Sequence, residues 1–467
     1  MDRLTHSPAQ DADRLRDLLE RALDASLDYL DSLDRRPPAT AFARNPPLEL
    51  PEDGLGAEGV FDLFMRRYGH AMPASNGPRF WGFVTGGTTP AALMGDWLTA
   101  VHDLNLSHAA HSVAPNIELE AIGWLRDLFG LPADFSGVFV TGATMANFVG
   151  LALGREWVAH QQGKSVAREG LNGLPPIAVF SGEAHSSIFK TLAMLGLGRN
   201  SLHAVGVLPG DREAADVAAL RDALKRLDGQ PCIVVANAGT VNTGDFDDLR
   251  AIAELKTRYR FWLHVDAAFG GFAACSPRRQ HLLAGIDAAD SITIDAHKWL
   301  NVPYDSGMMF TRHRDLQLSV FQNSAAYLGA IAEPPDFLHL SPENSRRLRA
   351  LPAWFTLLAY GRNGYRDLVE HHCTLAGMLG ERIAASTAFR LLAPVRLNIV
   401  CFTLRGEPDA EQVRQFLDRV RAGGRLFLTP TTFQGQAAMR AAFSNWRTRE
   451  EDLEIAWRAM NALCACP

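Results

Sequence analysis

Short apolar runs alternate with helix-length segments through the middle of the chain. Each run is nearly continuous in apolar residues, as in strands that are buried on both faces. The runs cover residues 137–141, 177–180, 204–208, 232–236, 261–265, 291–294 and 307–311. Because helix-length segments separate them, we predict an α/β fold with a seven-stranded, mainly parallel sheet covered on both faces.

The first part of the chain has a different pattern. Leucine and alanine recur at helical spacing through residues 14–33, with charged residues on the other face. A proline-rich stretch follows over residues 37–51, where proline excludes regular structure. We therefore expect residues 1–85 to form a helical arm ahead of the sheet.

Beyond residue 360 helical segments dominate again. Two apolar runs accompany them, at residues 397–404 and 426–428. We expect a large domain over residues 86–360 and a small C-terminal α+β domain over residues 361–467.

Composition narrows the class of protein. The chain is 47% hydrophobic and 21% charged, as in an ordinary globular protein. A net charge of −6 argues against a nucleic-acid surface, which needs a basic excess. The polar, acidic N-terminus does not resemble a signal peptide, no apolar run is long enough to span a membrane, and the cysteines are scattered. We expect a cytoplasmic protein without a structural metal.

Two candidate site residues directly follow predicted strands. Lys298 follows the run 291–294. A lysine in this position can be desolvated, which lowers the pKa of its amine and makes the amine nucleophilic. Asp266 ends the run 261–265 and precedes two small residues, Ala267 and Ala268. Taken singly, these positions also suit a surface lysine and a helix cap.

Two further elements lie earlier in the chain. Residues 141–147 run from a strand through glycine and small hydroxyl residues into a helix, whose first N–H groups would hold a phosphate. His185 follows the run 177–180 and could stack on a flat ring. An ordinary turn and a structural histidine are the alternatives.

The order of the four elements is phosphate turn, stacking histidine, carboxylate and lysine. This combination fits pyridoxal 5′-phosphate (PLP). A carboxylate beside the pyridine nitrogen keeps it protonated, so that the ring accepts electrons. Small residues such as Ala268 leave room for the ring.

The chain resembles the group II PLP-dependent decarboxylases from about residue 55 to its C-terminus. This group includes aromatic-L-amino-acid, histidine, glutamate and 2,4-diaminobutyrate decarboxylases. The motifs that carry the resemblance are His-Val-Asp-Ala-Ala at 264–268, His-Lys-Trp at 297–299, and the segments 236–244 and 444–447. The resemblance implies fold type I, that of aspartate aminotransferase.

The resemblance also implies roles for individual residues. Lys298 would form a Schiff base with PLP, Asp266 would pair with the ring nitrogen, and His185 would stack on the ring. The phosphate would be held by Ala143, Thr144 and His297, and Thr240 would complete the cofactor site along with Ala268.

An amino acid is the substrate that the resemblance implies, bound at the interface of a homodimer whose arms wrap the partner. The segment that resembles the substrate wall contains Phe80, Trp81, Phe83 and Val84. Their apolar character favours an aromatic or apolar substrate side chain, although aromatic residues near a turn also occur in a core.

Two positions depart from the family pattern. Asp295 replaces an asparagine near the phosphate, where a carboxylate is unfavourable unless it is turned away or hydrogen-bonded. Phe337 stands where aromatic decarboxylases carry a loop tyrosine that protonates the α-carbon. Relatives with phenylalanine there include aldehyde synthases, which consume O2. A shifted register, with His339 or water as the acid, would preserve simple decarboxylation.

Three readings of the function therefore differ in their products. Decarboxylation to an amine is the main prediction, and oxidative decarboxylation–deamination to an aldehyde is the first alternative. A fold-type I lyase or aminotransferase is the second, and an aminotransferase would need an arginine such as Arg440 or Arg447 for the substrate carboxylate. A binding protein that retains the fold would take up no PLP.

Overall fold

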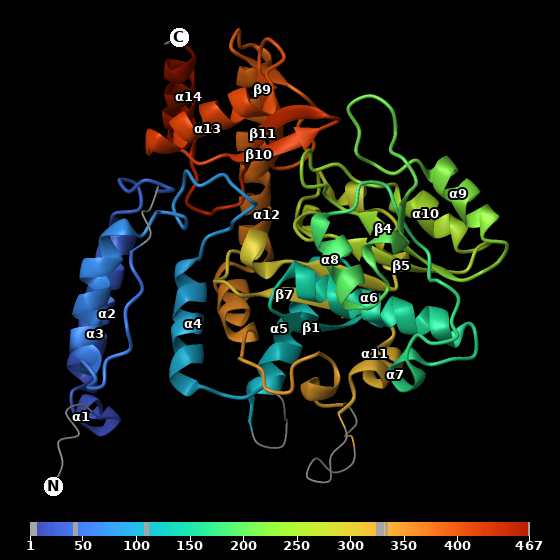
Figure 1. Cartoon of the computed structure of the whole chain (residues 1–467), viewed down its shortest axis with the longest axis horizontal. Coiled ribbons are helices and arrows are strands. Elements are labelled where there is room, and N and C mark those ends of the chain that lie inside the picture. Colours follow the sequence, from blue (N-terminus) through green and yellow to red (C-terminus); the bar gives the residue numbers. More distant parts are fainter. Residues whose placement is uncertain (1–6, 41–44, 107–111, 324–330, 332–334, 466–467) are drawn as a thin grey trace.

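The computed structural model describes residues 7–40, 45–106, 112–323, 331 and 335–465. Figure 1 shows three parts of the described chain: an N-terminal pair of helices, a central sheet with its helices, and a C-terminal sheet region. Among the described residues no helix is both long and apolar enough to cross a membrane.

The central sheet has the seven strands that the sequence predicts, in the order β1-β7-β6-β5-β4-β2-β3. Strand β7 is antiparallel to β1 and β6, and the other neighbours are parallel. The strands are β1 (Ser136–Val140), β2 (Val179–Ser181), β3 (Leu202–Ala204), β4 (Cys232–Asn237), β5 (Phe261–Asp266), β6 (Ser291–Ile294) and β7 (Gly307–Thr311).

Strand β3 begins earlier than predicted, and the reason is its place in the sheet. It is the edge strand next to β2, and its residues are partly or fully exposed. An edge strand pairs on one side only, so continuous hydrophobicity does not mark it. The apolar run 204–208 lies mostly after it.

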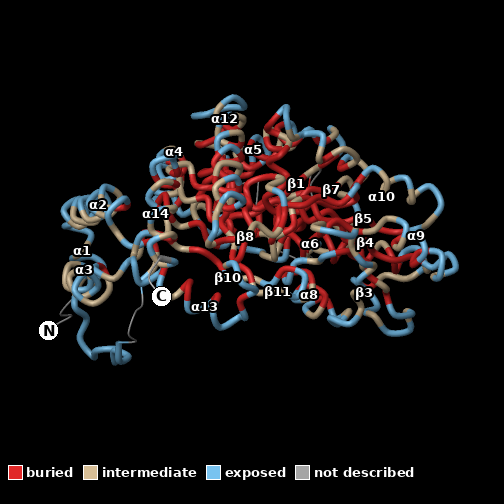
Figure 2. The backbone as a smooth tube through the Cα atoms, turned by 90° about the horizontal axis from the view of Figure 1, so that it is seen from above, coloured by how far each residue is buried: buried red, intermediate tan, exposed pale blue. Residues whose placement is uncertain are grey.

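Helices pack against both faces of this sheet, and Figure 2 shows buried residues concentrated there. Most of the buried apolar side chains of the described residues form one core around the sheet. Helix α6 crosses β5, β6 and β7 and also contacts α8. The helices of this part are α4 (Pro90–His102), α5 (Ala114–Leu128), α6 (Ala143–His160), α7 (Val166–Glu169), α8 (Ser186–Met194), α9 (Val217–Arg226), α10 (Leu249–Leu255) and α11 (Arg314–Phe321).

The C-terminal part has its own antiparallel sheet and its own apolar core. The sheet order is β10-β11-β9-β8, and the long helix α12 (Ala350–Ala384) leads into it, with non-helical backbone at Gly361. The elements are β8 (Phe389–Leu391), β9 (Ile399–Leu404), α13 (Ala410–Ala422), β10 (Thr429–Phe433), β11 (Gln436–Ala442) and α14 (Glu450–Ala465). The expected small α+β domain is confirmed, and its boundary at 360/361 stays a proposal.

The N-terminal arm consists of α1 (Pro8–Ala12), α2 (Leu15–Asp31) and α3 (Gly56–Arg67). Figures 1 and 2 show α2 and α3 side by side, set apart from the central sheet. Arg21 joins them through ion pairs with Glu58 at 2.9 Å and Asp62 at 2.5 Å. The helical arm expected from the sequence is therefore present.

Candidate active site

A cavity of about 360 Å³ lies beyond the carboxyl ends of β4 and β5, where ligands bind in open α/β sheets. Its walls come from segments that are far apart in the sequence, including β10 and β11 of the C-terminal part. Eight of the predicted site residues line it: Phe83, Val84, Ala143, His185, Thr240, Asp266, Ala268 and Lys298.

Lys298 is held by unusual local backbone. It lies in η7 (Ala296–Leu300), a π-helical turn directly after β6, and such turns are frequent at functional sites. A Cβ at Gly86 would lie 1.6 Å from the Lys298 carbonyl oxygen, so only glycine permits this approach. The Gly86 N–H also donates to the His297 carbonyl oxygen at 3.3 Å. The segment before α4 therefore fixes the lysine's backbone.

Asp266 ends β5 at the cavity and is only 6% exposed. Its Oδ1 accepts a hydrogen bond from the Ala268 N–H at 3.2 Å, and its Oδ2 accepts one from Asn147 Nδ2 at 3.0 Å. No basic side chain forms an ion pair with it among the described residues. A buried carboxylate without such a partner suits a ligand that brings a protonated nitrogen.

His185 precedes α8 and lines the same cavity. Its Nδ1 lies 3.2 Å from the Ser187 N–H, which donates to it, and 2.8 Å from Ser187 Oγ. Burial lowers the pKa of His185, and Asp266 opposes that shift. The lowered pKa favours the neutral form of the ring.

The predicted phosphate end lies where α6 begins. Ala143 is its first residue and Thr144 follows, although Thr144 is not among the residues that line the cavity. The His297 ring lies against Gly142, with its Cε1 3.0 Å from the site of a Cβ there. A helix N-terminus with an adjacent imidazole suits an anion.

Asp295, which departs from the family pattern, is buried and fully engaged with its surroundings. Its carboxylate lies 3.2 Å from His297 Nε2 and 3.5 Å from Lys298 Nζ, and the Ala143 N–H donates to it. Burial raises the pKa of Asp295, but Lys298 and His297 outweigh this and hold the pKa below its ordinary value. Asp295 is therefore an ionised, hydrogen-bonded group rather than one turned away.

Two residues of the predicted substrate wall do line the cavity. Phe83 and Val84 have φ values of 60° and 71°, which non-glycine residues rarely adopt. Such strain persists only where the surroundings enforce it, and it is concentrated at functional sites. Phe83 is 58% exposed, so it offers an apolar surface at the cavity.

The other two residues of that wall lie elsewhere. Trp81 is 1% exposed, belongs to the core of the C-terminal part, and packs on Phe443 at 4.6 Å between ring centres. Phe80 stacks on Phe427 at 4.6 Å. Neither lines the cavity, because this segment pairs with the strand region around Phe427 and turns only afterwards.

Phe337 also lies away from the cavity. It begins the 3₁₀ turn η8 (Phe337–His339), is 4% exposed, and packs in the main core with the Arg346 guanidinium 5.2 Å from its ring centre. Arg346 in turn forms a fully buried ion pair with Glu118 at 3.0 Å. A ring held in this way is not placed to influence protonation in its own chain's cavity.

The structure adds residues to the cavity beyond the predicted cofactor and substrate residues. Glu183, Asn237, Asn242 and Phe269 line the cavity, and so does Arg440 of β11. Arg440 was one of two candidates for a carboxylate-binding arginine. The other, Arg447, packs on Trp446 with its guanidinium 4.4 Å from the ring centre and does not line the cavity.

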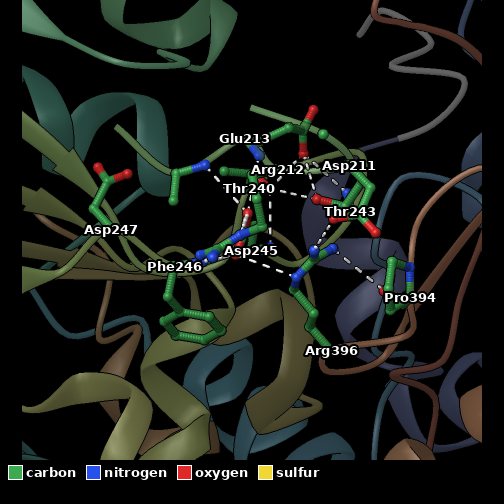
Figure 3. A network of polar contacts seen from close by, with 12 residues as sticks. Asp211, Arg212, Glu213, Thr240, Thr243, Asp245, Phe246, Asp247, Pro394 and Arg396 are labelled. Carbon is green, nitrogen blue, oxygen red and sulfur yellow. Dashed lines mark hydrogen bonds and ion pairs between the residues drawn. The ribbon is translucent and has the colours of Figure 1, made fainter. Parts of the chain in front are cut away.

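A buried carboxylate, Glu213, organises one wall of the cavity. It accepts hydrogen bonds from Thr240 Oγ1 at 2.5 Å, Thr243 Oγ1 at 2.7 Å and Asn242 Nδ2 at 2.9 Å. Figure 3 shows this network continuing through Asp245 to Arg212 and Arg396. The Thr240 hydroxyl thus donates its hydrogen to Glu213. Thr240 would therefore contribute to a cofactor site through van der Waals contact.

The site as a whole fits PLP. A lysine amine, a buried carboxylate, a neutral imidazole and a helix N-terminus surround one cavity, each suited to a different part of that molecule.

Comparisons with known proteins agree with this geometry. Residues 47–405 match the pyridoxal-dependent decarboxylase conserved domain. An aromatic-L-amino-acid decarboxylase of Bacillus atrophaeus is 26% identical over 461 residues, covering 95% of this chain and 94% of that protein. A 3,4-dihydroxyphenylacetaldehyde synthase of Aedes aegypti is 25% identical over 477 residues, covering 97% and 90%.

Solved structures show the same fold. The crystal structure of Oryza sativa TDC with PLP and tryptamine superposes with a TM-score of 0.87 at 23% identity, covering 98% of this chain and 99% of that one. The family match, together with a cavity built around Lys298 and Asp266, leads to one conclusion. The chain belongs to the pyridoxal-dependent decarboxylase family and is an amino-acid carboxy-lyase whose cofactor is PLP.

Proposed function

We propose that this enzyme removes the α-carboxylate of an aromatic L-amino acid and releases the amine. The observation that carries this proposal is the cavity in which Lys298, Asp266 and His185 meet an apolar wall. That wall contains Phe83, Val84, Val241 and Phe269. The aromatic substrate named for the Bacillus atrophaeus relative supports the choice.

Each group at the site has a separate task. The Lys298 amine would attach the cofactor covalently, and the Asp266 carboxylate would hold a proton on the ring nitrogen. Ala143, Thr144 and His297 would hold the phosphate, with Asp295 sharing the Ala143 N–H and the His297 ring. His185 would cover one ring face. Bound PLP supplies a sink for the electron pair that remains when CO2 leaves.

The cavity walls supply orientation. The walls would hold the substrate in one orientation at its α-carbon, and this fixed orientation would favour loss of the carboxylate. Phe83 and Phe269 lie on the cavity surface where they can grip an apolar side chain. Excluding water there would also limit unselective protonation of the α-carbon.

The first experiment is a substrate panel. PLP-loaded protein would be incubated with L-Phe, L-Tyr, L-Trp, L-Dopa, L-His, L-Glu and L-2,4-diaminobutyrate, with products identified by mass spectrometry and O2 uptake followed. We expect amines from the aromatic amino acids, without O2 uptake. Preference for Glu or 2,4-diaminobutyrate would refute the aromatic assignment, and transfer of the amino group to 2-oxoglutarate would indicate an aminotransferase.

The oxidative route is the alternative outcome of this panel, since one relative is an aldehyde synthase. Aldehyde with a matching consumption of O2 would establish it. A Phe337→Tyr variant then tests whether that residue is the cause. Because the ring is buried under Arg346, we expect an unchanged product ratio, and a higher amine-to-aldehyde ratio would restore the role predicted from the sequence.

We further propose that the protein is a homodimer with the cavity near the subunit interface. Leu15, Leu19, Leu23 and Leu27 repeat every fourth residue along α2, and each is more than two fifths exposed in the single chain. Such a stripe is typical of a surface that a partner covers. We expect Leu19→Glu/Leu23→Glu to shift the protein toward monomer in analytical ultracentrifugation, and an unchanged dimer would exclude this stripe from the interface.

A cytoplasmic location is proposed with this assembly. Cys232, Cys275, Cys373 and Cys401 are buried as free thiols, as in proteins of reducing compartments.

A further inference from the structure

A continuous chain of buried hydrogen bonds leads from the interior of the sheet to the cavity. Trp262 Nε1 donates to Ser291 Oγ at 2.9 Å, and Ser291 Oγ lies 2.7 Å from His264 Nδ1. His264 Nε2 lies 2.8 Å from Asn147 Oδ1, and Asn147 Nδ2 donates to Asp266 Oδ2 at 3.0 Å. All five side chains are buried, so each donor among them needs an acceptor within this chain of hydrogen bonds.

The direction of the chain follows from its last member. An ionised carboxylate only accepts hydrogen bonds, so Asn147 must present its NH2 group to Asp266 and its carbonyl oxygen to His264. His264 Nε2 therefore carries the ring proton. Burial lowers the pKa of His264 to about 4, so the ring is neutral and its Nδ1 accepts from the Ser291 hydroxyl.

A branch of the same chain reaches His185. Asn147 Nδ2 also donates to Ser187 Oγ at 3.1 Å, using its second hydrogen. The Ser187 hydroxyl can then donate a hydrogen bond to His185 Nδ1, which lies 2.8 Å from Ser187 Oγ. Since the Ser187 N–H also points at this nitrogen, Nδ1 is an acceptor and the His185 proton is on Nε2.

Asn147 is thus the branch point between two groups that line the cavity. It lies one turn into α6, and the close packing of this helix on β5 brings it there. A Cβ at Gly150 would lie 2.7 Å from the His264 ring, so glycine is needed for the approach. The amide cannot rotate without leaving both Asp266 and His264 with mismatched partners.

We propose that Asn147 is a positioning residue that fixes the Asp266 carboxylate and the Nε2–H form of His185 together, with His264 holding the amide in its one productive orientation. This rests on the assignment of Asp266 to the cofactor's ring nitrogen. No other amino acid of similar size meets the requirement. Aspartate lacks the two donors, and leucine lacks both donors and acceptor.

The test is a double-mutant cycle in the full-length protein with PLP. Asn147→Leu is made alone and in an Asp266→Ala background, and PLP affinity and kcat are measured for all four proteins. Removing a hydrogen bond to a charged group predicts a loss of about 10- to 100-fold for the single variant. In the Asp266→Ala background only the Asn147 contacts to Ser187 and His264 remain. We therefore expect the same substitution to cost clearly less there than in the unaltered protein.

The visible circular dichroism of bound PLP provides a readout independent of turnover. A cofactor held at a fixed angle gives a strong signal, and we expect Asn147→Leu to reduce it per bound PLP. Asn398→Leu is the matched control, because Asn398 is also fully buried and donates to a carbonyl, that of Phe443 at 2.9 Å, outside the cavity. It should lower thermal stability without changing the dichroism per bound PLP.

Two results would overturn the proposal. Equal losses of PLP affinity and kcat in both backgrounds would mean that Asn147 acts only through folding. Unchanged dichroism and PLP affinity in a folded Asn147→Leu protein would mean that Asp266 holds its place alone. If Asn147→Leu does not fold, the isosteric Asn147→Asp replaces it in the cycle. A harmless Asp266→Ala substitution would instead refute the cofactor assignment itself.

Discussion

Replacing Lys298 by alanine is expected to abolish turnover and the covalent attachment of PLP together. The amine comes from a π-helical turn whose backbone is fixed by Gly86, and Asp295 lies 3.5 Å from its Nζ. No other lysine lines the cavity, so no neighbouring amine among the described residues can replace it. Loss of a covalent nucleophile costs on the order of 10⁴-fold or more in kcat.

Borohydride reduction followed by mass spectrometry checks this directly. In the unaltered protein the reduced cofactor should remain on the peptide that contains Lys298, and in Lys298→Ala it should wash away. Lys190→Ala is the matched control, since Lys190 is an exposed lysine on α8 that does not line the cavity. Cofactor retained on another peptide of the Lys298→Ala protein would disprove the assignment.

The sheet could be predicted from the sequence because its strands are buried on both faces. Six of the seven lie within one or two residues of the predicted runs, and β3 at the edge is the exception. In a parallel sheet the carboxyl ends of strands meet at one edge, so polar residues after separate strands converge. This is why the sequence could predict that Lys298 and Asp266 lie close together, and both do line the cavity.

The C-terminal strands were harder to predict. Strand β11 (Gln436–Ala442) is rich in alanine, which favours helix, and its sheet partners determine its conformation instead. Strand β10 contains Pro430, which fits only because β10 is an edge strand. At both strands the residues' own conformational preferences disfavour a strand, and the contacts with the rest of the sheet determine the structure.

The direction in which individual side chains point also could not be predicted from the sequence. Phe80, Trp81, Phe83 and Val84 are adjacent, yet the first two pack inside the C-terminal part and the last two line the cavity. The change in direction follows from the left-handed backbone at Phe83 and Val84. Non-glycine residues rarely adopt this conformation, so the sequence does not predict it. Phe337 was assigned to its loop position by motif spacing, which does not reveal that the side chain is buried.

Asn147 had no signal of its own in the sequence. It lies in an apolar helix and looks like one polar residue in a buried stretch. The clue available was its distance of four residues from Ala143, one helical turn from the phosphate end. Only the packing of α6 on β5 shows that it faces His264 and Asp266.

Asp266→Asn is expected to lower kcat by at least about 10²-fold while leaving the fold intact. Asparagine has the same size, and its one carbonyl oxygen can still accept the hydrogen bond from Asn147, while the hydrogen bond from the Ala268 N–H is lost. A neutral amide, however, does not hold a proton on the ring nitrogen. Without that proton the cofactor withdraws electrons less strongly, and loss of one preorganised electrostatic partner has a cost of this size.

A cofactor analogue separates this electronic role from a structural one. N-methyl-PLP carries a fixed positive charge on its ring nitrogen, so it should restore part of the activity of Asp266→Asn and none of that of Lys298→Ala. The measurement is kcat for each variant loaded with PLP or the analogue, together with thermal unfolding to verify the fold. If N-methyl-PLP leaves the activity of Asp266→Asn unchanged, the carboxylate acts by positioning rather than by holding the proton. The rescue experiment thereby tests the property of Asp266 that its burial predicts, together with the lack of a basic partner in the described part of the chain.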